Sequence, residues 1–189
     1  EPAGRIGVVH NTRYCKYHNK YVAHFCFIDF ENDDNVVHTL VESAAEWSRK
    51  RGLQLLEGPM FAGGIYGSGL LVDGYDSSPP MTMMSYNYPY YEQRLLDEGF
   101  TKWIDLYSAA IDPATFVLPE KVTRIAELSR KRSGLSVLRF KNKREIKAIA
   151  QDLGKIVNNS IGMYAEDYPL TEREVSRITS ELLDVANPG

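Results

Sequence analysis

The chain has 189 residues, of which 43% are hydrophobic, 25% charged and 11% aromatic. This length allows one large domain, or one domain with a smaller partner, and the composition is that of a soluble globular protein with an apolar core. The net charge of −3 argues against a general nucleic-acid binder, because no excess positive charge can replace the counterions of a phosphate backbone. No apolar run approaches the roughly 20 residues of a membrane span, and no signal peptide is apparent.

The two cysteines are too few for a disulfide framework and favour a reducing, cytoplasmic location. Cys26 lies in the apolar run HFCFIDF and is predicted to be buried, whereas Cys15 lies in the polar run RYCKYH and is predicted to be exposed. The chain begins at EPAGRIGVV without an initiator Met, which we interpret as a fragment or a processed chain. The composition leaves a homodimer open and indicates neither a nucleic-acid nor a membrane partner.

In the first half of the chain, the residue types predict alternating strands and helices. Val, Ile, Phe and Tyr are enriched in the first two strand candidates, and ENDD offers N-caps for the helix that follows. The polar run NTRYCKYHNK fits a hairpin connection, and glycines at 52 and 99 fit helix ends. In chain order we expect strands at 4–10 and 21–30, a helix from 33 to 51, a short strand at 53–57 returning to the same sheet, a helix at 89–98 and a long strand at 100–111.

The composition shifts near Asp112-Pro113, and the second half is predicted to be mainly helical. An amphipathic helix is expected at 119–132, a strand at 135–140 and a helix at 143–161. The basic run KNKREIK is explained by a solvated helix face. Thr171 to Glu174 has the capping-box spacing T-x-x-E and predicts a last helix through Ala186.

Two segments of the first half resemble a known family. They are AAEWSRKRGLQLLEGPM and VDGYDSSPPMTMMSYNYPYYEQRLLDEGFTKWIDLYSAAID. Both are similar to a GNAT-like group of uncharacterised bacterial proteins, whose members resemble two N-acyltransferase folds in tandem. The shared strings are the G-P-M turn, L-L-V-D-G-[FY]-D, M-M-x-Y-N-x-P-Y-Y and a following G-F, and the resemblance covers about residues 4–112.

The resemblance implies an α/β fold, a GNAT-like mixed and mainly antiparallel sheet flanked by helices. Residues 1–112 would be the C-terminal part of one GNAT-like unit, 113–134 a linker helix, and 135–189 the start of a second unit. Because the first half lacks its early helices, it would expose one face of its sheet. We therefore expect the later helices to cover that face, in permuted order.

The resemblance also implies transfer of an acyl group from acetyl-CoA or another acyl-CoA to an amine of a small molecule, without a metal. In such a fold, backbone N–H groups at the start of the helix after the central strand bind the diphosphate. Here that turn is FENDDNVV, which makes Phe30, Asn35 and Val36 the candidate cofactor-binding residues. The turn has three acidic residues and no glycine, whereas the family pattern is [RQ]-x-x-G-x-[GA]. An acidic helix cap is therefore the alternative, and with it a non-catalytic, ligand-sensing or interaction domain.

The glycine-rich stretch GPMFAGGIYGSGLL is a second candidate for ligand binding. Gly64, Gly67 and Gly69 have the spacing G-x-x-G-x-G, without the Lys-Ser/Thr pair of a P-loop. They predict either a flexible loop around residues 62–69 or a substrate-facing loop that could hold an anion.

Catalytic candidates lie on both sides of this loop. The resemblance implies a tyrosine as general acid toward the leaving thiolate, which makes Tyr90 and Tyr91 the candidates, although Leu95 occupies the usual position. Asn87 could position a polar group of the cofactor or substrate. An aromatic cluster packed at the sheet edge is the alternative for the tyrosines. Glu57 is a candidate general base at a strand end, or else a solvated strand end.

The four histidines show no metal-ligand spacing. His24 lies on a predicted strand beside Phe25 and is expected to be packed or half-buried. His38 lies in the first turn of a predicted helix and is expected at the surface.

Overall fold

The computed structural model describes residues 2–61, 68–77, 84–160 and 167–185. The chain divides into two compact units, residues 1–109 with 162–168, and residues 110–161 with 169–189. Each unit has its own elements and is described by itself. This division leaves the predicted boundaries at 112 and 134 as predictions.

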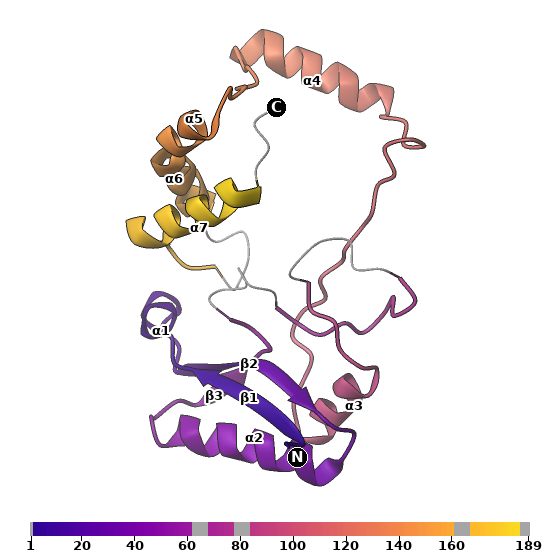
Figure 1. The fold of residues 1–189 in the computed structure, drawn as a ribbon, viewed down its shortest axis with the longest axis vertical. Helices are drawn as coiled ribbons and strands as arrows, with labels where there is room; N and C mark the ends of the chain where they lie inside the picture. Colours follow the sequence, from indigo (N-terminus) through magenta and orange to yellow (C-terminus); the bar gives the residue numbers. More distant parts are fainter. Residues whose placement is uncertain (1, 62–67, 78–83, 161–166, 186–189) are drawn as a thin grey trace. The chain divides into compact units, whose positions relative to one another are not determined.

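The first unit is built on a three-stranded mixed sheet in the order β1-β2-β3 (Figure 1). Strand β1 (Gly4–Val9) pairs antiparallel with β2 (Val22–Phe30), and β3 (Leu55–Glu57) pairs parallel with β2. The mixed α/β class and the return of the short strand to the same sheet are therefore confirmed. The GNAT-like form of the fold stays a prediction.

A wide connection that contains a short helix joins the first two strands, which pair antiparallel. Helix α1 (Thr12–His18) begins where the Asn11 side chain accepts a hydrogen bond from the backbone N–H of Tyr14 at 3.0 Å. It ends at Asn19, whose φ of 52° is the left-handed conformation that closes many helices. The predicted hairpin connection is confirmed in its strand pairing, but the helix within it was missed: asparagine supplies both caps of this short polar segment.

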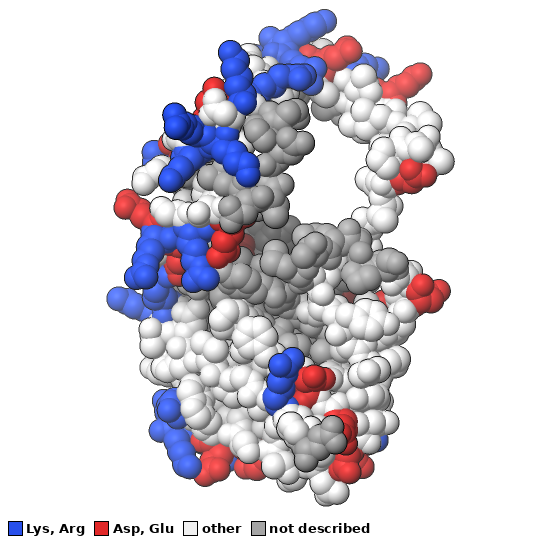
Figure 2. All heavy atoms as spheres, in the orientation of Figure 1, with Lys and Arg blue, Asp and Glu red and all other residues white. Residues whose placement is uncertain are grey.

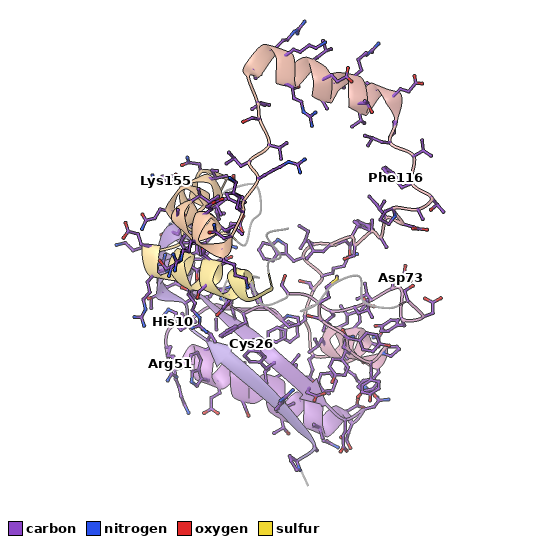
Figure 3. The ribbon with its side chains drawn as sticks, turned by 45° about the horizontal axis from the view of Figure 1, so that its top comes forward. His10, Cys26, Arg51, Asp73, Phe116 and Lys155 are labelled. Atoms are coloured by element: carbon purple, nitrogen blue, oxygen red, sulfur yellow. The ribbon has the colours of Figure 1, made fainter. Side chains whose placement is uncertain are left out.

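Cys15, on the same helix, was predicted to be exposed, but its thiol is partly covered. Cys15 is half-buried, and its Sγ donates to the carbonyl of Val22 at 3.3 Å. The helix turns this polar segment back over the sheet, which the hairpin interpretation did not anticipate. Cys26, in contrast, is buried on β2 as predicted (Figure 3).

Helix α2 (Asp34–Arg49) lies along one face of the sheet and encloses the larger core (Figure 1). Helix α3 (Tyr90–Asp97) completes this core, and Gly99 (φ 91°) follows its end as predicted. Both helices confirm the sequence prediction. The buried members of the core are Phe25, Phe30, Val37, Val41, Tyr91 and Leu95.

A smaller cluster packs elsewhere in the first unit, around the buried Tyr14. Its buried members are Tyr14, Val22, Met60 and Tyr168. Strand β2 is buried at five consecutive positions, from Val22 to Cys26. A strand covered on both faces shows such a continuous run and not a simple alternation.

Two predicted strands are absent from the described residues. No strand forms at 100–111 or at 135–140, although both segments are rich in β-branched and aromatic residues. Large side chains such as Trp103 and Tyr107 are exposed there. The predictions were wrong because β-propensity records how well a side chain fits a paired surface, and no described residues pair with these segments.

The second unit is helical, as predicted. It contains α4 (Glu120–Ser133), α5 (Lys143–Ala148), α6 (Ala150–Ser160) and α7 (Glu172–Val185). The single helix predicted at 143–161 is divided at Ile149. The capping box is confirmed, because Thr171 Oγ1 accepts from the Glu174 N–H at 3.2 Å and Glu174 accepts from the Thr171 N–H at 2.7 Å.

Helix α4 has no buried residue and carries three consecutive basic residues in its last turn, Arg130, Lys131 and Arg132. Lys and Arg side chains gather along this helix and the segment after it (Figure 2). None of the helices in the described part of the chain is both long enough and apolar enough to cross a membrane.

Candidate functional site

The centre of the candidate site is a β-bulge in β2. Gly7 pairs with Cys26 and Arg5 pairs with Asp29, so one residue of β1 lies opposite two residues of β2, Phe27 and Ile28. Phe27 adopts a φ of 49°, which is unusual for a bulky residue. The extra residue of a bulge leaves the hydrogen-bond ladder, and bulges are frequent next to active sites. The sequence held no signal for this bulge, because the run HFCFIDF has no glycine.

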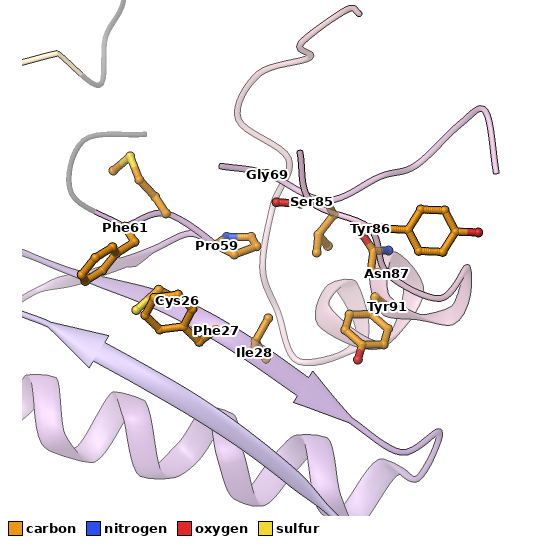
Figure 4. A pocket seen from close by; sticks show the side chains of 12 residues that line it. Cys26, Phe27, Ile28, Pro59, Phe61, Gly69, Ser85, Tyr86, Asn87 and Tyr91 are labelled. Carbon is orange, nitrogen blue, oxygen red and sulfur yellow. The ribbon is translucent and has the colours of Figure 1, made fainter. Parts of the chain in front are cut away.

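A pocket of about 180 Å³ opens beside the bulge (Figure 4). Cys26, Phe27 and Ile28 contribute to it from β2, and Tyr91 contributes from α3. The other lining residues are Pro59, Met60, Phe61, Gly69, Leu70, Ser85, Tyr86 and Asn87. The lining combines apolar side chains with a few polar groups, which is the usual character of a small-molecule site.

The glycine-rich stretch contributes to this pocket at both of its described ends. A Cβ on Gly58 would lie 2.7 Å from Cδ1 of Phe25, so only glycine allows the chain to approach β2 this closely. Gly69 (φ 77°) donates its N–H to the carbonyl of Pro59 at 2.8 Å and lines the pocket. Gly64 and Gly67 lie outside the described residues, so the substrate-loop role of the three glycines stays a prediction.

Asn87 is buried in the pocket wall, where it holds the chain that follows the glycine-rich stretch. Its Oδ1 accepts from the N–H of Leu71 at 2.7 Å, and its Nδ2 donates to the carbonyls of Leu71 and Tyr88 at 3.1 and 3.0 Å. The amide thus pairs with Leu71 as a neighbouring strand would. Its predicted part in binding a cofactor stays a prediction.

The two tyrosines of the predicted catalytic set bind the last residue of β2. The Tyr91 hydroxyl donates to Asp29 Oδ1 at 2.6 Å and accepts from the N–H of Phe30 at 3.1 Å, and Tyr90 donates to the carbonyl of Phe30 at 2.7 Å. Burial, followed by the hydrogen bond to Asp29, raises the pKa of Tyr91 to about 12. Both hydroxyls therefore hold the strand end, and a proton on Tyr91 is released less readily than from a free tyrosine.

The turn expected to bind the diphosphate of CoA does not fit that group. The Asp33 carboxylate accepts from the N–H groups of Asn35 and Val36 at 2.8 and 3.4 Å and caps α2. The N–H of Phe30 is bound by Tyr91. A diphosphate at this turn would have to displace the capping carboxylate and lie close to its negative charge.

A buried polar cluster lies where β2 and β3 pair. His24 is 4% exposed, and its Nε2 lies 3.8 Å from Oε2 of Glu57, whose Oε1 lies 3.5 Å from Nζ of Lys20. Burial, with smaller contributions from the charges of Lys20 and His18, lowers the pKa of His24 to about 4. The sequence predicted the burial of His24, but the parallel pairing that brings it to Glu57 was not visible. The described residues contain no group of three or more His, Cys, Asp or Glu side chains that could hold a metal ion.

Two known proteins are similar to almost the whole chain. Bacterial ceramide synthase from Caulobacter vibrioides is 32% identical over 165 residues, which cover 86% of this chain and 41% of that protein. Protein YghO from Escherichia coli is 26% identical over 179 residues, which cover 95% of this chain and 45% of that protein. The chain thus spans less than half the length of these relatives. No protein-family model and no solved structure matches the chain.

Proposed function

We propose that the chain is part of an acyltransferase that joins an acyl group from acyl-CoA to an amine of a small molecule. The observation that carries the proposal is the 32% identity to bacterial ceramide synthase across 86% of the chain. A ceramide is an amide, so its synthesis joins an acyl group to an amine. Because this chain spans only 41% of that relative, the activity is proposed for the protein to which the chain belongs.

The pocket beside the bulge supports this proposal. Its apolar side chains suit the acyl segment of a thioester, and the bulge formed by Phe27 and Ile28, where one residue leaves the ladder, borders the pocket. Peptide N–H groups that point at a carbonyl oxygen stabilise the negative charge that develops there during acyl transfer. We therefore assign the acyl group to the pocket, with its carbonyl toward the bulge.

This assignment does not provide a binding site for the diphosphate of acyl-CoA. Since Asp33 occupies the N–H groups of Asn35 and Val36, acyl-CoA would have to be held elsewhere on the protein. The same observation favours the second candidate, a domain that keeps the scaffold without catalysis. The two candidates differ in whether acyl-CoA binds at the pocket at all.

Isothermal titration with palmitoyl-CoA, acetyl-CoA and free coenzyme A separates the candidates. We expect binding of palmitoyl-CoA that Ser85→Trp weakens by about tenfold or more, equivalent to ~1.4 kcal/mol, because the indole would fill part of the pocket. Ser77→Trp is the matched control, since Ser77 is an exposed residue outside the pocket lining. Absence of heat with every acyl-CoA, or equal affinities of the two variants, would contradict the proposal.

A further inference from the structure

The pair formed by His24 and Glu57 has unmet hydrogen-bonding capacity. Neither His24 Nε2 nor Glu57 Oε2 has a hydrogen-bond partner among the described residues, and both atoms are buried. Their separation of 3.8 Å is too long for a direct hydrogen bond. Buried polar atoms are nearly always satisfied in folded proteins, so such a pair indicates a missing third group.

The surrounding groups leave these two atoms facing each other. Lys20 lies two residues after the end of α1, and its Nζ is 3.5 Å from the other carboxylate oxygen of Glu57. On α1, His18 Nε2 is bound to the carbonyl of Asp167 at 2.8 Å, and the ring of Tyr14 meets the His24 ring edge-on at 4.6 Å. The two buried atoms that remain to be satisfied are thus Nε2 of His24 and Oε2 of Glu57.

The pair lies next to the pocket. His24 and Cys26 are two residues apart on β2, which places them on the same face at a spacing of about 7 Å. Cys26 lines the pocket, and so does Met60, which also packs with Tyr14 in the smaller cluster. A ligand held by the pair therefore needs to extend by only about 7 Å along β2 to reach the pocket.

We propose that His24 and Glu57 bind the amino group of the acceptor substrate, between Nε2 and Oε2. This inference rests on the proposed function, in which an amine receives the acyl group. An uncharged amine has two N–H donors, and with the ring proton of His24 on Nδ1 both acceptors can be satisfied at once. The lone pair of the amine then stays free.

With the ring proton of His24 on Nδ1, the same geometry selects amines over alcohols. In that tautomer both buried atoms are acceptors, so a hydroxyl, with its single donor, would leave one of them unsatisfied. Burial of the site and the ammonium of Lys20 lower the pKa of a bound amine, whereas the carboxylate of Glu57 raises it. A free amine, and not an ammonium ion, is the nucleophile that acyl transfer requires.

Nuclear magnetic resonance of the ring nitrogens in ¹⁵N-histidine-labelled protein tests this site without catalysis. We expect octylamine to shift the His24 resonances, and octanol to do so at least about tenfold more weakly. His38 is the internal reference, because its Nδ1 forms an exposed pair with Glu98 Oε2 at 3.0 Å. Unchanged His24 resonances, or equal shifts with octylamine and octanol, would overturn the inference.

A pair of glutamate variants checks which carboxylate is responsible. Glu57→Gln should weaken octylamine binding by about tenfold to a hundredfold, because a charge-assisted hydrogen bond is lost, while Glu98→Gln should leave it unchanged. Equal binding by the two variants would contradict the assignment. If palmitoyl-CoA binds while octylamine leaves His24 unchanged, the inference fails and the proposed function stands. If octylamine binds but acyl-CoA does not, the acyl-transfer proposal fails.

Discussion

His24 is almost completely buried, although the ordinary pKa of an imidazole is 6.5, close to neutral pH. Its pKa is lowered from 6.5 to about 4 in the folded protein, so the unfolded chain binds more protons between these values. We predict that the free energy of unfolding is fully retained above pH 6.5 and falls by about 3 kcal/mol as the pH drops to 4, at ~1.4 kcal/mol for each pH unit. Urea denaturation across this range measures the change.

Replacement of two histidines separates this effect from general acid sensitivity. His24→Gln should remove most of the slope between pH 6.5 and 4, because no buried imidazole remains to be protonated on unfolding. His38→Gln should retain the slope, since the His38 side chain is 67% exposed. If the free energy of unfolding of His24→Gln still falls as steeply between pH 6.5 and 4, other groups cause the pH dependence.

Tyr91 and Tyr90 also differ in a way that single substitutions can measure. Tyr91→Phe leaves the N–H of Phe30 and the carboxylate of Asp29 without their partner, and we predict a loss of about 1–3 kcal/mol in stability. Tyr90→Phe removes one bond to a carbonyl and should cost less, about 1 kcal/mol. Thermal unfolding ranks the two variants, and the opposite order would contradict the strand-end role of Tyr91.

At the scale of elements, the start of α2 depends on one carboxylate. We predict that Asp33→Ala lowers the free energy of unfolding by about 1 kcal/mol, because the N–H groups of Asn35 and Val36 lose their acceptor. Asp33→Ser should retain most of this stability, because its hydroxyl also accepts hydrogen bonds. Urea denaturation compares the two variants. Neither should bind palmitoyl-CoA more tightly than the original protein. A gain in affinity for Asp33→Ser would show that the diphosphate uses this turn after all.

The packing of α6 on α7 depends on a glycine. A Cβ on Gly154 would lie 2.7 Å from Cγ1 of Val175, so Gly154→Ala should destabilise the second unit despite the higher helix propensity of alanine. Val175→Ala should relieve the clash and recover stability in the double variant. Circular dichroism during thermal unfolding measures both, and a Gly154→Ala protein that is more stable than the original would contradict the close approach.

The helices were predictable because their signals are local. Asp33, Thr171 and Gly99 mark helix ends by chemistry that acts within a few residues. Strands at 100–111 and 135–140 were wrongly predicted because pairing depends on residues elsewhere in the chain. Helix α1 was missed because its polar sequence also fits a turn, and only the conformation of Asn19 distinguishes the two.

The candidate site was predictable in its residues but not in its geometry. Tyr91, Asn87 and Gly69 were all singled out from the sequence, and the structure brings them to one pocket. The bulge at Phe27 and the approach of His24 to Glu57 arise from strand register, which no local pattern encodes. The hydrogen bonds of Asp33 to Asn35 and Val36 show why the predicted diphosphate turn already has a partner.

At the scale of the whole molecule, the chain matches less than half the length of each relative. It spans 41% of bacterial ceramide synthase and 45% of YghO, and large apolar side chains such as Trp103, Tyr107 and Val117 are exposed. The reaction is therefore proposed for a protein of the relatives' length. Binding of acyl-CoA and of amine, in contrast, is assigned to groups of the first unit described above.

Amide formation tests the central claim most directly. The full protein is incubated with palmitoyl-CoA and a long-chain amino alcohol, and mass spectrometry follows donor, acceptor and products. We predict an N-acyl amide and free coenzyme A in equal amounts, and much less of both with Ser85→Trp than with Ser77→Trp. Intact palmitoyl-CoA and amine after incubation, with no amide, would contradict the proposed acyl transfer.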